Sequence, residues 1–423
     1  MEKQAKKRIL IIIGAYLPGY KVGGPGVSIA NLVEALGDEY DFRIMCADHD
    51  LGESEPYKGV VPYKWTKVGK AKVFYVPKFT GKVTLKLCRS ADLVYMCGCF
   101  NDYARQVLRA KSKRKFEAPV VIAAMGLFAP GAYRISGLKK RIYMALTRLA
   151  GYYDEVSWSA TTREEAVDVA RALHCDISEL PYHVAKDLPR VSLIDGTGNP
   201  KTDGKGNLKK AGTGKPKKAG ADKLKNDVTG SLKKRRKEKN TLSVIFLSRI
   251  SPEKNLSAVA QIIAAAGGDI SLEVYGPAED KEYFEECKRK LDEAGVSWKY
   301  HGPVRSDDVF KAFSKSDVFL FPTLGENFGH VISEALCAGC PVITSDRTPW
   351  NDLSEHGAGF SLGLPDSDED YHEWAAALKH YAEMSAEEMS KVSENCISYI
   401  RSKIDIDSLK AAYRDMFEDE LEG

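Results

Sequence analysis

Short runs of apolar residues alternate with longer helical patterns along most of the chain. Five such runs in the first half predict buried strands at residues 9–13, 42–46, 73–76, 93–97 and 120–124. Elsewhere in this half, apolar residues recur every three to four positions, which predicts helices at residues 27–36, 101–110, 139–149 and 163–173. This alternation is typical of a parallel sheet with helical crossovers.

The second half of the chain repeats the pattern. Strands are predicted at residues 242–247, 271–275, 297–300, 318–321 and 341–344, and helices at residues 256–266, 279–294, 307–313 and 331–338. We therefore expect an α/β fold of two doubly wound, parallel-sheet domains that face each other. In such folds ligands bind at the carboxyl ends of the strands, so we expect the working site in the cleft between the domains.

Residues 194–240 interrupt this pattern, because they contain almost no large apolar residue and are rich in Lys and Gly. Without apolar surface to offset the entropy lost on ordering, such a segment is predicted to be a disordered insertion or linker. The expected organisation is an N-terminal domain at residues 1–190, a linker at 191–240 and a C-terminal domain with terminal helices at 241–423.

The charge of the chain is unevenly distributed, although the net value is only +3. Residues 1–190 carry 30 basic and 20 acidic side chains, residues 191–240 carry 15 and 5, and residues 241–423 carry 17 and 34. The basic first half and linker favour an anionic partner, such as a membrane surface, a nucleic acid or a phosphorylated acceptor.

Cysteine content and hydropathy restrict the class of protein. The nine cysteines are scattered and odd in number, which is not a disulfide framework and fits a reducing cytoplasm. No stretch approaches the roughly 18 apolar residues of a membrane-spanning helix, and the short apolar run near the start is interpreted as a first strand rather than a signal peptide. We expect a cytoplasmic protein.

A glycine-rich loop, GAYLPGYKVGGPGVSIANL, follows the first predicted strand. Gly23, Gly24 and Gly26 allow close approach of the backbone, and the start of the following helix attracts anions, so the loop is a candidate phosphate site. The spacing is not that of the GxGxxG dinucleotide motif and no P-loop lysine follows. The alternative is an ordinary turn before a helix.

Two cations follow the first strand of the second half, in FLSRISPEKNL. Arg249 and Lys254 are both placed to face the cleft, where a bidentate guanidinium and an ammonium suit a diphosphate. They would stabilise the negative charge that develops on a departing nucleoside diphosphate. The alternative is a pair of surface charges in a strand-to-helix turn.

Two carboxylates eight positions apart lie in FPTLGENFGHVISEALCAGCPVITSD. Glu326 precedes the predicted helix and could meet sugar hydroxyls, whereas Glu334 within it could accept hydrogen bonds from a ribose diol. The amides of Asn327, Phe328 and Gly329 at the helix start can bind hydroxyl or phosphate oxygens. The alternative is that Glu326 is an acid at the N-terminus of the helix and Glu334 a solvated residue on its face.

These motifs resemble those of the retaining glycosyltransferases of family 4, which have the GT-B architecture of two facing Rossmann-like domains. The resemblance is carried by the Glu-x7-Glu pattern in ENFGHVISE, by SRISPEKNL before it, and by EALCAGCPVITSD and TPWNDL after it, over roughly residues 242–362. A weaker similarity lies in VGGPGVSIANLVEAL and MGLFAPGAYRISGLKKRIY of the first half.

The resemblance implies a role for each of these residues. It implies that Arg249 and Lys254 hold the donor diphosphate, that Glu326 contacts the transferred sugar and that Glu334 binds the donor ribose. From the other domain, Gly23 and Gly24 would close over the phosphates. In the second half, His330 directly follows Gly329 and is a candidate contact of the donor sugar; the alternative is that it only starts a helix.

The sequence departs from the family at one position of the expected cleft. Many relatives have a histidine in the stretch that reads AAMGLFAPGAYR here, and this chain has none. We therefore assign no general base, and Arg134 is a candidate substitute contact. Under a front-face mechanism the leaving phosphate oxygen takes the acceptor proton, so a base is not required.

No metal or cofactor is expected beyond the sugar nucleotide. Asp48-His49-Asp50 follows a predicted strand and is interpreted as a polar loop, and the pair Cys337 and Cys340 lacks the second ligand pair of a zinc site.

The predicted function is transfer of a sugar from a nucleotide sugar to a glycan or polyprenyl-diphosphate-linked acceptor in surface polysaccharide synthesis. A phosphorylase or synthase of disaccharides with the same architecture is the alternative among enzymes. A nucleic-acid-binding protein that uses the linker is the alternative of another class, although the segment lacks aromatic residues for base stacking.

The stretch GLKKRIYMALTRLAGYY has apolar residues on one helical face and basic residues around it. Such a pattern favours a helix that packs on the core with a solvated basic face. The alternative is contact with an anionic membrane, which would make the protein peripheral on the inner face of the membrane.

Overall fold

The computed structural model describes residues 5–19, 21, 23–128, 133, 137–194, 241–365 and 370–423. The chain divides into two compact units, one formed by Met1–Leu188 with Ile406–Gly423 and the other by Pro189–Asp405. Both are α/β units with a central sheet, as predicted. Of the linker predicted at residues 191–240, residues 195–240 lie outside the described residues, whereas Val191–Ile194 form a short helix.

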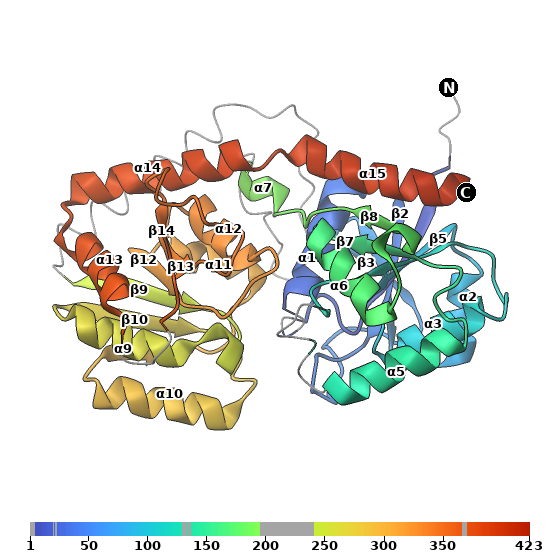
Figure 1. Ribbon diagram of the computed structural model, residues 1–423, viewed down its shortest axis with the longest axis horizontal. Coiled ribbons are helices and arrows are strands. Elements are labelled where there is room, and N and C mark those ends of the chain that lie inside the picture. Colours follow the sequence, from blue (N-terminus) through green and yellow to red (C-terminus); the bar gives the residue numbers. More distant parts are fainter. Residues whose placement is uncertain are drawn as a thin grey trace. The chain divides into compact units, whose positions relative to one another are not determined.

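The sheet of the first unit has the strand order β3-β4-β2-β1-β5-β6-β7-β8 and is parallel except for the pair β3 and β4 (Figure 1). Its strands are β1 (Arg8–Ile12), β2 (Asp41–Ala47), β3 (Trp65–Val68), β4 (Ala71–Val76), β5 (Leu93–Cys97), β6 (Val120–Ala123), β7 (Ser157–Ala160) and β8 (Tyr182–Val184). The five strands predicted for this half are confirmed, and β3, β7 and β8 were not predicted.

Successive side chains of β1 point to opposite faces of the sheet, and each face has its own hydrophobic cluster. Ile9 and Ile11 face one hydrophobic cluster and Leu10 and Ile12 face the other. The second cluster is covered by α2 (Gly81–Cys88), α3 (Asp102–Lys111), α5 (Gly137–Leu149) and α6 (Arg163–Leu173), with η1 (Ile177–Glu179) after α6. The first is covered by α1 (Gly24–Leu36) and by the last helix of the chain.

This last helix, α15 (Ile406–Glu422), belongs to a different unit than expected. We expected residues 241–423 to form one domain, but α15 groups with the first unit. The reason is packing, since Met416 and Phe417 are fully buried in the cluster that contains Ile9 and Ile11. The Arg414 guanidinium also donates to Glu39 at 2.6 and 2.9 Å.

The second unit has an all-parallel sheet of order β11-β10-β9-β12-β13-β14. Its strands are β9 (Leu242–Leu247), β10 (Ile270–Tyr275), β11 (Ser297–Tyr300), β12 (Val318–Phe321), β13 (Val342–Ser345) and β14 (Gly359–Leu362). The five predicted strands are confirmed. Chain order reverses between β9 and β12, because the chain leaves β9 towards β10 and later returns to pair β12 on the other side of β9.

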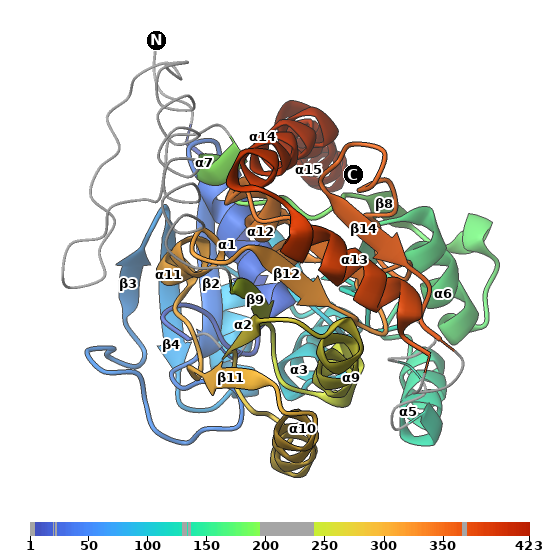
Figure 2. The same cartoon turned by 90° about the vertical axis from the view of Figure 1, so that its left-hand side faces the viewer.

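Two layers of helices sandwich this sheet (Figure 2). One layer holds α9 (Leu256–Ala266), α10 (Lys281–Glu293) and α13 (His372–Glu383), and the other holds α11 (Ser306–Phe313), α12 (His330–Cys337) and α14 (Ala386–Lys403). The short helix α7 (Val191–Ile194) packs on α12, and η2 (Pro252–Lys254) precedes α9. Each helix in the described part of the chain is too short or too polar to span a bilayer.

Helix α5 does not bury the face that its pattern suggested. Leu138, Ile142, Leu146 and Leu149 are exposed, and Met144 and Thr147 are buried instead. The expectation that the apolar face packs on the core is therefore wrong. The helix packs on the core instead through Met144, Thr147 and the half-buried Tyr143 on its opposite side.

Candidate functional site

The candidate site of the second unit begins just beyond the end of β9. Arg249 lies two residues after this strand, and Lys254 ends the short helix η2. The Arg249 side chain is partly exposed, whereas only 8% of the Lys254 side chain is exposed. A lysine ammonium is rarely buried without a charged partner, so we expect a carboxylate next to Lys254.

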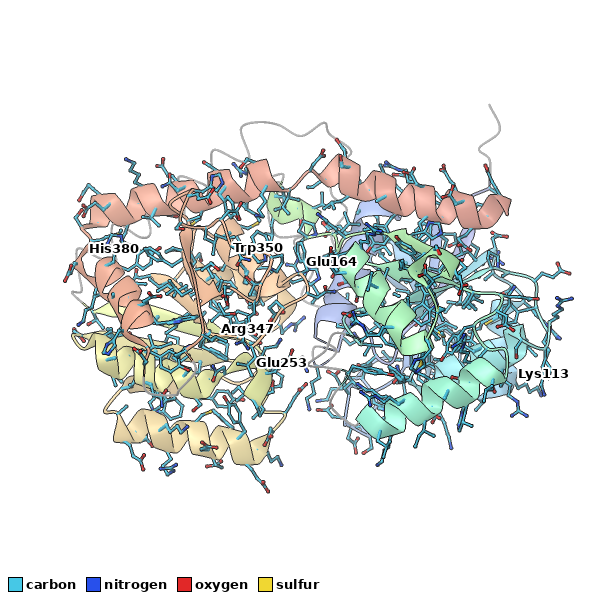
Figure 3. All side chains as sticks on the ribbon, viewed as in Figure 1. Lys113, Glu164, Glu253, Arg347, Trp350 and His380 are labelled. Carbon is cyan, nitrogen blue, oxygen red and sulfur yellow. The ribbon has the colours of Figure 1, made fainter. Side chains whose placement is uncertain are left out.

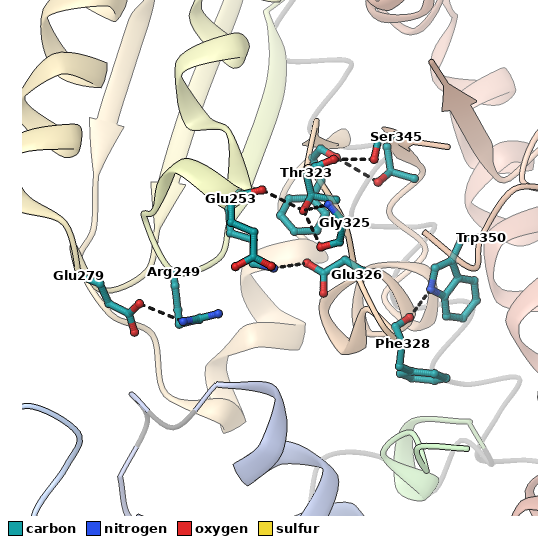
Figure 4. A network of polar contacts seen from close by, with 12 residues as sticks. Arg249, Glu253, Glu279, Thr323, Gly325, Glu326, Phe328, Ser345 and Trp350 are labelled. Carbon is teal, nitrogen blue, oxygen red and sulfur yellow. Dashed lines mark hydrogen bonds and ion pairs between the residues drawn. The ribbon is translucent and has the colours of Figure 1, made fainter. Parts of the chain in front are cut away.

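That partner is Glu326, which comes from the loop after the neighbouring strand β12. The Lys254 ammonium donates to the Glu326 carboxylate at 2.9 Å, and 15% of the Glu326 side chain is exposed (Figure 4). Burial raises the pKa of Glu326, and the charge of Lys254 opposes that rise. Strand order alone brings these two residues together over a separation of 72 positions.

The loop that carries Glu326 is fastened on both sides. The Leu324 amide donates to the Glu253 carbonyl at 2.8 Å, and the Glu326 amide donates to the Arg347 carbonyl at 3.1 Å. The hydroxyl of Ser345 donates to the Thr323 carbonyl at 2.6 Å. Glu253 and Arg347 lie on the same side of the second unit (Figure 3). The loops after β9, β12 and β13 therefore form one connected edge.

Arg249 also has an acidic partner that the sequence did not indicate. Its guanidinium donates to Glu279 at 2.9 Å, and Glu279 lies beyond the end of β10. The loop after β10 approaches the loop after β9 closely at Gly276, because a Cβ atom placed there would lie 1.7 Å from the Ser248 carbonyl oxygen. The Gly-Pro pair at 276–277 is the only sequence signal that marked this turn.

The segment Asn327–Phe328–Gly329 leads directly into α12, as expected. Gly329 has a left-handed backbone with φ 75°, which glycine adopts without strain. The Trp350 indole donates to the Phe328 carbonyl at 2.6 Å and fixes the turn. His330 is the first residue of the helix.

Glu334 lies one turn into α12, on the side that meets α7. Burial raises the pKa of Glu334, and the positive charge of Arg190 opposes the rise. Arg190 immediately precedes α7, a helix that the sequence pattern did not indicate. Glu326 thus precedes the turn that leads into α12 and Glu334 lies within this helix, each near a cation.

The reversal of chain order between β9 and β12 explains why the side chains converge here. In open α/β sheets the loops at such a point diverge to opposite faces and leave room for a ligand at the carboxyl ends of the strands. Arg249 and Lys254 follow β9, and Glu326 follows β12. The structure therefore brings together three of the predicted residues in one unit.

The predicted residues of the first unit form a separate group. Gly23 caps α1 with φ 64°, and Gly24 is the first residue of that helix. Their expected closure over phosphates held by the second unit stays a prediction, and Arg134 lies outside the described residues. His49 pairs with Asp48 at 2.8 Å in the loop after β2. The expectation of no metal also stays a prediction.

The family comparison concerns the unit that carries the candidate site. The model of the glycosyl transferases group 1 matches residues 228–401. Residues 228–401 are therefore similar to a group 1 glycosyl transferase domain. The described part of the matched range includes β9 and ends in α14, so it contains Arg249, Lys254, Glu326 and Glu334.

Curated relatives match parts of the chain. It is 30% identical over 108 residues to the GDP-mannose-dependent alpha-mannosyltransferase of Mycolicibacterium smegmatis, which is 26% of each chain. It is 30% identical over 118 residues to the 2-deoxystreptamine N-acetyl-D-glucosaminyltransferase of Niallia circulans, which is 27% of this chain and 30% of that one. The matches thus span about a quarter to a third of these relatives.

A solved structure extends the likeness to the whole chain. The Anabaena protein Alr3699/HepE, in complex with UDP and glucose, has a TM-score of 0.65 at 15% identity, with 98% of this chain and 100% of that chain covered. The predicted GT-B fold of two parallel-sheet α/β domains is therefore confirmed.

Proposed function

We propose that the chain is a retaining glycosyltransferase that uses a nucleoside-diphosphate sugar as donor. Its acceptor is a glycan or a polyprenyl-diphosphate-linked glycan of surface polysaccharide synthesis. The observation that carries this proposal is the convergence of Arg249, Lys254 and Glu326 at the point where chain order reverses in the second sheet. The group 1 domain match over the same residues supports it.

Both cations can bind a diphosphate while they keep their carboxylate partners. An ammonium has three N–H donors and a guanidinium has five. Two donors of Lys254 are used, by Glu326 at 2.9 Å and by Glu253 at 3.3 Å, and Nη1 of Arg249 is used by Glu279. The remaining donors are available for phosphate oxygens. The ion pairs then hold the two cations in place before the donor binds, which lowers the entropy lost on binding.

Glu326 has a second role in this proposal. Lys254 favours its ionised form, in which both carboxylate oxygens accept hydrogen bonds from sugar hydroxyls. The tethers of its loop to Glu253 and Arg347 set its position. Glu334, near the positive charge of Arg190, is the proposed acceptor for the donor ribose hydroxyls.

The transfer step needs no protein base in this arrangement. The bond between the anomeric carbon and the diphosphate oxygen breaks, and the acceptor oxygen bonds to the same face of that carbon. The acceptor proton passes to the departing phosphate oxygen. Arg249 and Lys254 stabilise the charge that develops on the diphosphate, which is where preorganised cations lower a barrier most.

Ligand binding and product stereochemistry test the proposal. A screen of UDP-, GDP- and ADP-sugars should identify one that raises the melting temperature, because a ligand that binds only the native state stabilises it. NMR of the product should show an anomeric configuration equal to that of the donor. Glu326→Gln should lower kcat/KM by about 100-fold or more. It also leaves the Lys254 ammonium without its charged partner, so the melting temperature should fall, and circular dichroism at the assay temperature must show that the variant is folded.

The matched control is Glu355→Gln, which changes an exposed glutamate of the same unit and should leave kcat/KM unchanged. Full activity of Glu326→Gln contradicts the role assigned to this carboxylate. Cleavage of a disaccharide that requires inorganic phosphate and no nucleotide contradicts the nucleotide-sugar donor and favours a phosphorylase.

A further inference from the structure

Helix α5 turns its large apolar side chains away from the first unit. The exposed fractions of Leu138, Ile142, Leu146 and Leu149 are 74%, 52%, 62% and 85%. Spacings of four, four and three residues place all of them on one helical face. Nine large hydrophobic side chains are exposed in the described part of the chain, and four of them lie on this helix.

The attachment of α5 to the unit does not use this face. Met144 and Thr147 are buried beneath the helix, and the Thr147 hydroxyl donates to the Tyr143 carbonyl at 2.7 Å. The Tyr143 hydroxyl in turn donates to the Cys99 carbonyl at 3.0 Å. Folding therefore gives no reason for leucine or isoleucine at the exposed positions, where polar residues would serve equally.

Basic side chains border the apolar face on both sides. At 3.6 residues per turn, each residue advances by about 100°, which puts exposed Lys139 on one side of the face and exposed Arg141 and Arg148 on the other. The helix GLKKRIYMALTRL contains no acidic residue. Basic residues at both borders of an apolar face suit a surface whose interior is apolar and whose outer layer is anionic. Long cationic side chains can extend from such a face to phosphate groups in the outer layer.

A second basic segment lies near the carboxyl end of the helix. Lys113, Arg114 and Lys115 are exposed in the turn after α3, and Arg114 pairs with Glu155 at 2.8 Å. Glu155 follows α5 by six residues, so this pair brings the turn near that end of the helix. The pairing also offsets one of the two exposed acids there, Asp154 and Glu155.

We propose that α5 docks the protein on an anionic lipid bilayer. The four apolar side chains enter the boundary between headgroups and acyl chains, while Lys139, Arg141 and Arg148 contact lipid phosphates. This inference stands on the first unit alone and goes beyond the proposed transfer reaction. It deepens the proposed function in one respect, because a polyprenyl-linked acceptor resides at such a surface.

The test is co-sedimentation of the full chain with vesicles. Phosphatidylcholine vesicles are compared with vesicles that also contain phosphatidylglycerol, and the expected result is much stronger binding to the anionic set. Leu146→Glu/Leu149→Glu should abolish binding. Lys139→Gln/Arg141→Gln should weaken it by up to about 30-fold, since each of the two basic residues near the surface contributes about 1 kcal/mol before screening.

The matched control is Leu51→Glu/Val61→Glu, which adds the same charge at two exposed apolar positions of the same unit and should bind like the unmodified protein. Circular dichroism and the melting temperature confirm that each variant is folded. Donor binding by thermal shift should be the same in all of them, which separates this proposal from the proposed function.

Three outcomes overturn the proposal. The first is equal binding to neutral and anionic vesicles. The second is unchanged binding of the Leu146→Glu/Leu149→Glu variant, which would assign binding to another region such as the Lys-rich segment. The third is a dimer in light scattering that this variant dissociates, without vesicle binding, which would make the face a contact between two copies of the chain.

Discussion

The ion pair of Lys254 and Glu326 shows what a single residue contributes to both folding and chemistry. Two charges with 8% and 15% exposed side chains have lost most of their hydration, and each is tolerated because the other is present. Removal of one partner leaves an uncompensated buried charge. Replacement of both residues by apolar side chains of similar size leaves no buried charge, and such a replacement is often neutral for stability.

A double-mutant cycle tests this view. Lys254→Met should lower the free energy of unfolding by about 3–5 kcal/mol. The double variant Lys254→Met/Glu326→Leu should recover most of that loss in urea unfolding, yet remain inactive in transfer. Lys281→Met, at an exposed lysine of the same unit, is the control and should change little. Losses that simply add would show that the pair is not coupled.

The sequence was sufficient to predict some residues of the candidate site, whereas others could be recognised only in the structure. Arg249, Lys254 and Glu326 follow strand ends, and strand ends of a parallel sheet share an edge, so their convergence was predictable. The partner of Arg249 was not, because Glu279 is one of many acids in the second half and only the approach of the loops at Gly276 selects it. Thr323 and Ser345 act through backbone contacts, which leave no pattern in the sequence.

Helix α15 shows which part of helix packing a sequence can predict. The spacing of apolar residues gives the face of a helix that is buried, but it does not give the element on which that face packs. Phe417 contacts the rings of Tyr40, Phe42 and Tyr95 at centroid distances of 5.3, 6.3 and 6.1 Å. These aromatic residues belong to the first unit, and their contacts with Phe417 hold the helix on that unit.

We expect Phe417→Ala to destabilise the first unit by about 3–5 kcal/mol, because it removes a fully buried ring. Glu418→Ala changes the neighbouring exposed residue and should have an effect below about 0.5 kcal/mol. Thermal unfolding of both variants measures the difference. A small effect of Phe417→Ala would mean that α15 is not part of the core.

The buried strands were predictable as elements because each is a run of apolar residues. Strand β7 was not, since its sequence SWSA is short and half polar, and it is recognised only by its pairing with β6. Strand β8 likewise has three residues and no buried one. Helix α5 was predicted with its bounds, but its exposed leucines could not be distinguished from core leucines by spacing.

At the scale of the whole molecule, the chain forms two compact units, and both hydrophobic clusters of the first unit consist of residues of that unit alone. Differential scanning calorimetry should therefore show two transitions. Phe417→Ala should lower the temperature of one, and Lys254→Met the temperature of the other. A single transition that shifts in both variants would show instead that the units unfold together.

The return of α15 to the first unit makes the second unit an insertion in the sequence of the first. A ribosome completes the second unit before it reaches Phe417, so the first sheet lacks its last helix while the inserted unit can already fold. We expect the rings of Phe42 and Tyr95, which contact Phe417 in the folded protein, to be uncovered in the nascent chain during that interval. A chaperone would be expected to bind these apolar side chains during synthesis.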